Sequence, residues 1–424
     1  MQSWKEETEG LIMKIIVIGG GAAGFFGAIS AAKNNPQAEV TLLEASQQPL
    51  AKVRISGGGR CNVTHACFES KELIQHYPRG AKALLGAFSR FQPQDTVTWF
   101  AERGVPLKTE ADGRMFPITD DSETIVNCLL KTAKSTGVEL VTGAVVIGVK
   151  LVSENPSQFQ VTLKSGEKLR CDRILLATGS NPVGYRIAQE LGHKITQPVP
   201  SLFTFNVPDE KLRELAGVSV NPANLRLTIP GYPQLEQNGA LLITHWGLSG
   251  PAVLKLSAWA ARMLHEKHYQ ANLTVNLTPH LKQEEVRQKL LTAKVDFPRK
   301  AIALHRGIDL PHRLWQYLVF RAGVTLDTRW AELSSKVLNH LIQDINQGQY
   351  SIHGKGVFKD EFVTCGGVNL KEVNFKTMES RVTPGLYFAG EVLDIDGVTG
   401  GFNFQSAWTT SYLAGSAMGT GNSE

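Results

Sequence analysis

Short apolar runs alternate with glycine-rich and polar breaks at the start of the chain. Residues 14–18 read Lys-Ile-Ile-Val-Ile, and Gly-Gly-Gly-Ala-Ala-Gly follows them. This pattern predicts a buried strand, a tight turn and a helix that begins at Gly24 and ends near Lys33. After a polar turn, a second strand is predicted over Glu39–Leu43.

Helical periodicity then dominates residues 80–134, with a helix start at Pro93 and an extended or turn segment at 113–117. Residues 138–151 alternate as a strand does. The runs 159–163 and 168–171 are separated by Ser165-Gly166, which is typical of a hairpin. A buried strand follows and ends in Ala177-Thr178-Gly179.

The pattern changes after a proline-rich linker that begins at Gln197. Short β runs at 203–207, 225–229 and 240–244 predict a small β-barrel or sandwich. Further elements follow by the same criteria: a helix at 252–265, a helical stretch at 278–346 with turns at Pro298 and Pro311, a return to β character after 357, a strand before Gly390, and a last helix at 406–418.

Composition and charge narrow the class of protein. The 424 residues suit two or three domains, and no apolar run reaches the roughly 18 residues that span a bilayer. The first residues lack the features of a secretory signal, so a cytoplasmic location is expected. The net charge of +5 is compatible with an anionic partner such as RNA. The five cysteines lack paired spacing, which argues against disulfides and against a zinc site.

The first glycine-rich turn has the G-x-G-x-x-G spacing of a dinucleotide-binding loop. Gly19 permits the turn, Gly21 lets the backbone approach a pyrophosphate, and Gly24 allows close helix packing. The amides of the helix start, including Ala22 and Ala23, would face the phosphates. Glu44 lies twenty residues beyond Gly24 at the end of the second strand, followed by Ala45. Its carboxylate suits the ribose hydroxyls of an adenosine.

A second glycine-rich stretch runs from Lys52 to Thr64 and contains Ser-Gly-Gly-Gly-Arg-Cys-Asn. Three consecutive glycines predict a loop whose backbone comes close to a ligand. With Lys52, Arg60 and Asn62 as polar groups, it is interpreted as a second wall around the pyrophosphate and flavin ring. A mobile surface linker is the alternative interpretation.

Two residues are candidates for chemistry. Cys61 follows Arg60, whose charge would favour the thiolate, so proton donation or covalent capture is one hypothesis. The other is a small buried residue that packs near the ring. His245 is a candidate acid, base or substrate contact, and a structural histidine is its alternative.

Further cofactor contacts are predicted where strands end and where the last helix begins. Ligands bind at the carboxyl ends of parallel strands, and the backbone amides of a helix start could stabilise negative charge on the N1/O2 side of a reduced flavin. The predicted contacts are Val146, Thr178, Gly179, Gly390, Glu391, Gly400, Gly401, Phe402 and Asn403.

Four stretches together resemble one family. They are Ile18–Gly24, Ser56–Thr64, Thr244–Pro251 and Gly390–Gln405. The chain is similar through them to the BaiN/YhiN-type NAD(P)/FAD-dependent flavoproteins, also labelled the aminoacetone oxidase family. The resemblance implies FAD as cofactor and links the chain to reduction of carbon–carbon double bonds, including uridine in ribosomal RNA and unsaturated steroids, and to amine oxidation. Gly390-Glu391 stands where the wider superfamily has Gly-Asp.

The resemblance also implies an α/β fold, in which a discontinuous glutathione-reductase-type FAD-binding Rossmann domain carries inserted β-barrel and helical subdomains. The middle third of the chain would then select the substrate. The predicted division is a leader at 1–12, the first part of the FAD-binding domain at 13–196, a β-barrel-like insert at 197–277, a helical subdomain at 278–346, a return through the insert at 347–362, and the second part of the FAD-binding domain at 363–424.

The sequence therefore predicts an FAD-dependent oxidoreductase that reduces a carbon–carbon double bond. A second complete G-x-G-x-x-G is absent, so NAD(P)H, the expected reductant, would visit the face of the flavin that the substrate uses. The alternatives are an amine or small-molecule oxidase and a non-catalytic flavin-binding protein. RNA stays open as a partner, with a basic face predicted from Arg299, Lys300, His305, Arg306, His312, Arg313 and Arg321.

Overall fold

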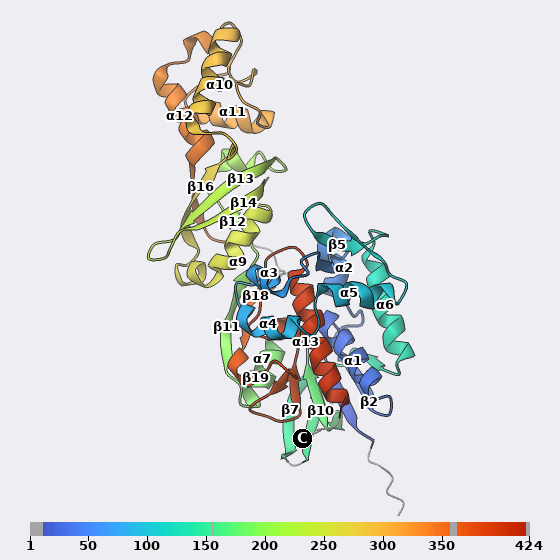
Figure 1. Ribbon diagram of the computed structural model, residues 1–424. Coiled ribbons are helices and arrows are strands. Elements are labelled where there is room, and N and C mark those ends of the chain that lie inside the picture. The colour runs from blue at the N-terminus through green and yellow to red at the C-terminus, as the bar shows by residue number, and fades with distance from the viewer. Residues whose placement is uncertain (1–11, 155, 357–362, 421–424) are drawn as a thin grey trace, which may run out of the picture. The chain divides into compact units, whose positions relative to one another are not determined.

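The computed structural model describes residues 12–154, 156–356 and 363–420. The chain folds into two compact units (Figure 1). The first comprises residues up to Pro198 and from Thr364 onward, and the second is Val199–Val363. The predicted leader, apart from Ile12, lies outside the described residues.

Unit 1 is organised around a seven-stranded sheet with the order β19-β20-β21-β10-β1-β2-β6. The five strands from β21 to β6 are parallel, and β19 and β20 add an antiparallel edge. The strands are β1 (Lys14–Ile18), β2 (Glu39–Glu44), β6 (Glu139–Thr142), β10 (Arg173–Leu176), β19 (Val373–Asn374), β20 (Glu379–Ser380) and β21 (Leu386–Phe388). Because the sheet is covered on both faces, β1 is an almost unbroken apolar run, and Ile15 to Ile18 are all buried.

Two helices from opposite ends of the chain pack side by side in unit 1 (Figure 1). They are α1 (Ala22–Asn34) and α13 (Phe402–Gly419). Glycines permit the close approach, since a Cβ on Gly415 would lie 2.3 Å from the Gly27 carbonyl oxygen. Gly27 faces Ser411 and Gly419 faces Asn34, so both helices run in the same direction. Their N-termini therefore point toward the same side of the unit.

Three of the remaining helices of unit 1 lie at residues 81–135, where helical periodicity is predicted. Its helical elements are α2 (Ala51–Gly59), α3 (Ser70–Leu73), η1 (Ile74–His76), α4 (Ala81–Phe88), α5 (Pro93–Ala101), α6 (Ser122–Ser135), α7 (Pro182–Glu190), η3 (Leu370–Glu372) and η4 (Gly390–Val392). The predicted helix start at Pro93 is confirmed, and a capping box between Gln92 and Asp95 fixes it.

Two small antiparallel sheets complete unit 1. One contains β3 (Thr64–His65), β4 (Leu107–Thr109) and β5 (Arg114–Pro117), which confirms the extended segment near 113–117. The other contains β7 (Val146–Glu154), β8 (Ser157–Leu163) and β9 (Lys168–Cys171). The hairpin across Ser165-Gly166 is confirmed by the pairing of Thr162 with Lys168.

Two predicted boundaries are wrong. The stretch from Lys52 is predicted as a loop, but α2 begins at Ala51, and the backbone leaves the helical region only at Ser56, Gly57 and Gly58. The last helix begins at Phe402 and not at 406, because Gly401, with φ +94°, ends the preceding turn and caps the helix directly.

The chain passes between the units through β11 (Ile195–Ser201) and β18 (Val363–Val368), which pair as a two-stranded sheet. Unit 2 contains an antiparallel sheet with the order β12-β15-β14-β13-β16-β17. Its elements are β12 (Phe205–Asn206), α8 (Glu210–Arg213), β13 (Ser219–Thr228), β14 (Leu235–Thr244), β15 (Gly247–Ser249), α9 (Pro251–Glu266), β16 (Gln270–Asn276) and β17 (Gly348–His353). A bridge between Phe205 and Lys355 joins the two edges, so the sheet closes in the manner of the predicted barrel.

A helical subdomain forms one end of unit 2 (Figure 1). It contains α10 (Gln283–Asp296), α11 (His312–Arg321), η2 (Trp330–Glu332) and α12 (Ser335–Gln347), as the periodicity predicts. Trp315 and Trp330 are fully buried at its centre, with ring centroids 6.1 Å apart. The predicted turns at Pro298 and Pro311 lie between α10 and α11.

Candidate functional site

Several predicted cofactor contacts lie where the parallel strands of unit 1 end, at the carboxyl-terminal edge of the sheet. β1, β2, β10 and β21 all run toward this edge, and Gly19, Glu44, Gly179 and Gly390 lie at or directly after their ends. The three glycines have positive φ angles of 110°, 59° and 73°. Left-handed backbone favours glycine, so the chain turns sharply at each strand end. This edge is where open α/β sheets bind their ligands.

The first glycine turn has the geometry that its spacing predicts. A Cβ on Gly24 would lie 1.8 Å from the Gly19 carbonyl oxygen, and a Cβ on Gly19 would lie 2.5 Å from the Ala177 oxygen. These two glycines are therefore required by packing. A Cβ on Gly21 would meet no atom within 4 Å, so the space in front of this residue is open. That open approach beside a helix start fits a pyrophosphate.

The first amides of α1 are hydrogen-bond donors without an acceptor inside the helix. The first residues of a helix have no intrahelical acceptor for their amides, and these are Ala22, Ala23 and Gly24 here. No acidic residue lies in the first turn, so the positive end of the helix dipole is not neutralised.

Glu44 lies beside this turn with a fixed carboxylate. Its Oε2 accepts a hydrogen bond from the Gly20 amide at 2.7 Å, and its Oε1 accepts one from the Ser46 amide at 2.8 Å. Ala45, which follows, is exposed. Two backbone amides thus fix the position of the Glu44 carboxylate, which is the predicted contact of the ribose.

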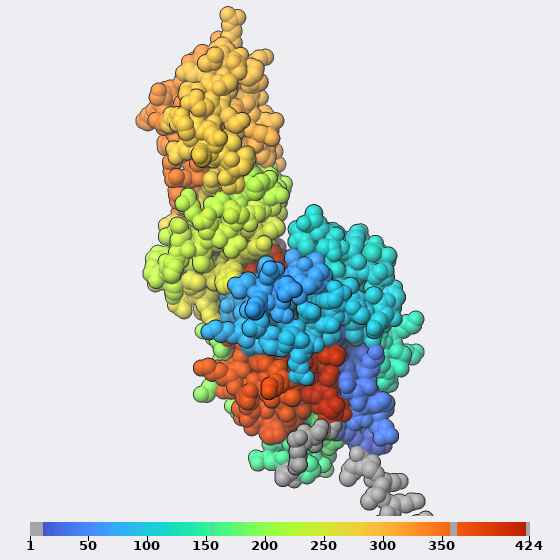
Figure 2. All heavy atoms as spheres, in the orientation of Figure 1, coloured from blue at the N-terminus to red at the C-terminus, as the bar shows by residue number. Residues whose placement is uncertain are grey.

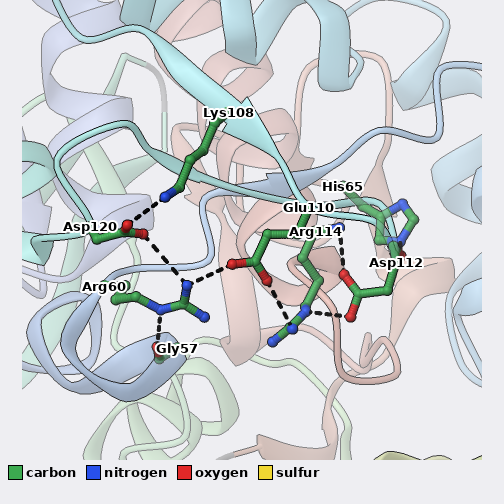
Figure 3. Close-up of polar contacts among 8 residues, drawn as sticks. All are labelled: Gly57, Arg60, His65, Lys108, Glu110, Asp112, Arg114 and Asp120. Carbon is green, nitrogen blue, oxygen red and sulfur yellow. Dashed lines mark hydrogen bonds and ion pairs between the residues drawn. The ribbon is translucent and has the colours of Figure 1, made fainter.

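A network of charged side chains holds the second glycine stretch (Figure 3). Arg60 Nη1 lies 2.6 Å from Glu110 Oε1 and 3.5 Å from Asp120 Oδ1. The hydrogen bond to Glu110 raises the pKa of Arg60. Its guanidinium carbon lies 4.0 Å from the centroid of the Phe116 ring. Lys108 pairs with Asp120, and Arg114 pairs with Glu110 and Asp112. Arg60 therefore fastens Gly57–Gly59 to the β4–β5 hairpin.

Cys61 faces the interior. Its side chain is fully buried, and burial raises the pKa of its thiol to about 12. The expectation that Arg60 favours a thiolate is therefore wrong, because burial outweighs it and the guanidinium is paired with Glu110 and Asp120. The environment favours the alternative of a small packing residue.

The glycine loops from the two ends of the chain meet at Asn62. Its carboxamide donates a hydrogen bond to the Thr64 oxygen and accepts one from the Gly401 amide, both at 3.0 Å. A Cβ on Gly401 would lie 2.4 Å from the Thr64 oxygen, so only glycine fits. Trp408 reinforces this junction by donating to the Val63 oxygen at 2.9 Å.

The start of α13 is a second helix N-terminus without an acidic residue in its first turn. The side chain of Asn403 is used internally, since it exchanges two hydrogen bonds with the backbone of Gly397, each 2.8 Å long. Phe402 stacks on His65 and His76, with centroid separations of 4.6 and 4.2 Å. The amides of Phe402 and Asn403 begin α13 and have no intrahelical acceptor, so a cofactor contact of these residues would be through the backbone. The predicted contacts of Gly400 and Gly401 stay predictions.

Glu391 ties three segments together. Its Oε2 lies 2.6 Å from Lys52 Nζ, and its Oε1 accepts a hydrogen bond from the Thr364 amide at 2.9 Å. The predicted contact of Glu391 with ribitol stays a prediction.

Two buried hydroxyls lie near the end of β10. Thr178 Oγ1 and Tyr185 Oη have no hydrogen-bond partner in the described part of the chain. Buried polar groups are rarely left unpaired, so such hydroxyls fit a site that a ligand completes. Val146, the first residue of β7, is buried, and its predicted contact stays a prediction.

The sequence did not indicate the residues that hold the segment between Glu391 and α13 in place. Asp396 is fully buried and pairs with Arg79, whose Nε donates to Asp396 Oδ1 at 2.5 Å. An aspartate inside the apolar run that follows Glu391 is the signal that could have found this pair. His65 and His76 offered no comparable signal.

His245 belongs to unit 2. It is exposed on the turn between β14 and β15, next to Trp246, whose side chain is 43% exposed. Its role as an acid, a base or a substrate contact stays a prediction. Among the described residues, no cluster of three His, Cys, Asp or Glu could hold a metal ion, and no helix is long and apolar enough to cross a membrane.

Comparisons with known proteins agree with this geometry. The model of a family described as HI0933-like protein Rossmann domain matches residues 13–417. The chain is 29% identical to a 3-dehydro-bile acid delta(4,6)-reductase from Clostridium scindens, covering 95% of this chain and 98% of the relative. It is 30% identical to proteins named ribosomal RNA dihydrouridine synthase from Haemophilus influenzae and Escherichia coli, covering 94% of this chain and 96% of each relative.

Two solved structures share the fold. A 3-ketosteroid-delta4-(5alpha)-dehydrogenase from Rhodococcus jostii superposes with a TM-score of 0.52 at 15% identity, covering 98% of this chain and 99% of that chain. An open flavocytochrome c3 fumarate reductase superposes with a TM-score of 0.50 at 16% identity, covering 96% and 78%.

Proposed function

We propose that this chain, which belongs to the HI0933-like Rossmann-domain family and is an FAD-dependent oxidoreductase, reduces a carbon–carbon double bond in an organic substrate. The observation that carries the proposal is the junction of the two glycine loops at Asn62, which brings the start of α13 to the sheet edge that also carries the start of α1. Two helix starts at one site suit a cofactor with a pyrophosphate at one end and a redox ring at the other.

The names of the relatives support the type of reaction. One relative is named a reductase of delta(4,6) compounds, and two are named dihydrouridine synthases. Dihydrouridine is uridine whose ring carbon–carbon double bond has gained two hydrogen atoms. A double bond accepts hydride readily only when a neighbouring group takes up the negative charge, so we expect a carbonyl conjugated to it.

The residues of unit 1 have distinct roles in this proposal. The amides of Ala22 to Gly24 bind the pyrophosphate, and Glu44 binds the adenosine ribose. The amides of Phe402 and Asn403, the first residues of α13, stabilise negative charge at the atoms they face. FAD, when bound, supplies two-electron transfer at its ring.

The overall reaction is balanced by one reductant. NAD(P)H gives up a hydride, the substrate gains that hydride on one carbon of the double bond, and a proton reaches the other carbon. Of the two predicted proton donors, His245 is the one whose side chain is accessible, whereas Cys61 is buried with a pKa of about 12. Cys61 is therefore disfavoured as the proton donor, and His245 stays a predicted one.

Uridine in RNA is the substrate we favour. Two of the relatives are named for it, and residues 278–347 hold most of the excess positive charge of the chain. An apolar enone, such as a 3-oxo steroid, is the second candidate, favoured by the name of the other relative. The amine-oxidase alternative has no support among the named relatives, and the oxidoreductase family argues against a non-catalytic flavoprotein.

Anaerobic half-reactions test the proposal. NADPH or NADH is added to the FAD-loaded protein without oxygen, and the visible flavin band is followed. The band should bleach, and it should return when a uridine-containing ribosomal RNA fragment or a 3-oxo-4-ene steroid is added. Bleaching by an amine with no effect of NADPH or NADH would overturn the proposal in favour of an oxidase.

A further inference from the structure

The positive charge of the chain is concentrated in the helical subdomain. Residues 278–347 contain eleven lysines and arginines and seven aspartates and glutamates, an excess of four. The whole chain has 44 lysines and arginines and 39 aspartates and glutamates, an excess of five positive charges. About one sixth of the sequence thus carries most of the net charge.

Only part of the predicted basic face lies free at the surface. Arg321 pairs with Asp344 at 3.6 Å and contacts Tyr317, and Arg313 donates to the Glu214 carbonyl oxygen. These two arginines therefore also hold the fold of unit 2, and their part in a basic face stays a prediction.

Other cations of the subdomain remain exposed. Lys289, Arg299 and Lys300 are exposed, and within the described ranges none of them forms an ion pair. Two nearby carboxylates are used inside the fold, because Glu285 caps the start of α10 and Glu332 caps the start of η2. These cations belong to the helical subdomain, drawn in yellow and orange in Figure 2, whose residues 278–347 have an excess of four positive charges.

Two open hollows meet at this surface. Their volumes are about 320 and 510 Å³, and both are lined by Lys289, Arg306 and Gly307. Phe297 lines the smaller hollow, and its side chain is 39% exposed. Its ring is tilted by 57° to the ring of His305, with the centroids 4.0 Å apart. Each hollow is also lined by one carboxylate, Asp296 or Asp309. Arg306 lies 3.9 Å from Asp309 and donates to the Leu310 oxygen, so Lys289 is the lining cation that forms no ion pair within the described ranges.

We infer that this surface, formed by Lys289, Phe297, Arg299, Lys300 and Arg306, binds a single-stranded segment of RNA. A phosphate would lie between Lys289 and Arg306, and a base would stack on the exposed ring of Phe297. Cations beside an exposed aromatic ring are the combination that single-stranded nucleic acids require, and an acidic peptide would not need the ring. The inference rests on the proposed function, in which RNA supplies the substrate.

The test separates the aromatic contact from the charged ones. FAD-loaded protein is titrated into a fluorescently labelled, uridine-rich single-stranded RNA at several salt concentrations, and anisotropy gives the affinity. Phe297→Ala should weaken binding about tenfold and leave the salt dependence unchanged, because stacking involves no counterion. Lys289→Gln should weaken binding and reduce the slope of log K against log salt by roughly 0.7, the amount expected for one phosphate contact.

A matched control is Lys211→Gln. Lys211 is exposed on α8 and lines neither hollow. Its replacement by glutamine changes the net charge by the same amount as Lys289→Gln. It should bind RNA as the wild type does. Equal weakening by Lys211→Gln and Lys289→Gln would overturn the inference, because RNA affinity would then depend only on the net charge of the protein. Wild-type affinity in both Phe297→Ala and Lys289→Gln would also overturn it.

The proposed function is measured separately in the same variants. Phe297→Ala and Lys289→Gln should keep the wild-type rate of flavin bleaching by NADPH or NADH, since both residues lie in unit 2. Unaltered RNA binding with normal bleaching would reject this surface and leave the reductase proposal intact. Loss of bleaching in the wild type would reject the reductase proposal itself.

Discussion

Lys52 Nζ lies 2.6 Å from Glu391 Oε2, although the two residues are 339 positions apart in the chain. Lys52 belongs to α2, and Glu391 follows the last strand of the parallel sheet. The same carboxylate accepts a hydrogen bond from Thr364 of β18. One side chain therefore joins both ends of the chain at the edge where the cofactor is proposed to bind.

Replacing Lys52 with methionine should affect the cofactor more than the fold. The lysine side chain is 54% exposed, so the ion pair should contribute under about 1 kcal/mol to the free energy of unfolding. The loosened α2 should release FAD several-fold faster, as measured by the recovery of flavin fluorescence after dilution. Lys71→Met, on the surface of α3, is the control. An FAD release rate equal to that of the wild type would contradict the positioning role of Lys52.

Glu44→Gln should weaken FAD binding by roughly 10- to 100-fold, the usual loss for hydrogen bonds to a charged group. Isothermal titration of the apoprotein with FAD measures this change. Glu39→Gln is the matched control, because Glu39 begins the same strand and its side chain is 56% exposed. Equal affinities in both variants would show that Glu44 does not contact the cofactor.

The buried thiol of Cys61 makes stability depend on alkaline pH. Burial raises its pKa from 9.0 to about 12, so the folded state keeps a proton that the unfolded chain loses. This contribution is fully present below pH 9 and is lost as the pH rises toward 12. The stability difference between wild type and Cys61→Ala should therefore shrink by about 1.4 kcal/mol between pH 7 and pH 10.

Urea unfolding at both pH values measures that difference. Cys61 should also resist alkylation in the folded protein, whereas Cys67, which is only partly buried, should react first. Rapid alkylation of Cys61 in a Cys67→Ser background would contradict the buried, protonated thiol and would restore the nucleophile hypothesis.

Arg79→Met should destabilise the fold strongly. It leaves the fully buried carboxylate of Asp396 without its main cation, a loss of roughly 3–5 kcal/mol. The double variant Arg79→Met/Asp396→Leu should recover part of this loss, because it removes the buried charge as well. Urea unfolding followed by tryptophan fluorescence gives the comparison. A double variant less stable than Arg79→Met alone would argue against an ion-pair origin.

The first glycine turn could be predicted because its causes are local. Gly19, Gly21 and Gly24 are within six positions of each other, and the strand and helix around them follow from adjacent residues. The glycine-rich stretch at Gly390–Gln405 could be found for the same reason, but the first residue of its helix could not be predicted. The helix begins at Phe402 because Gly401 adopts a left-handed conformation against Thr64, a contact with a distant residue.

The braces of the site could not be predicted because they join segments far apart in the sequence. Arg79 and Asp396 are 317 positions apart, and Arg60 reaches Glu110 across 50 positions. The error at Cys61 has the same origin. Arg60 precedes it directly, but the left-handed turn at Gly57 to Gly59 sends the arginine to the hairpin and the cysteine into the core.

The central claim is that both ends of the chain form one FAD site, and FAD content per chain tests it most directly. Wild type and Gly21→Val are purified, saturated with FAD and freed of unbound cofactor, and bound FAD is compared with protein. A side chain at position 21 has space within the protein itself, so the variant should fold while blocking the cofactor. One FAD per wild-type chain and almost none in Gly21→Val is the predicted result. Equal FAD content in both proteins, or none in the wild type, would contradict the account.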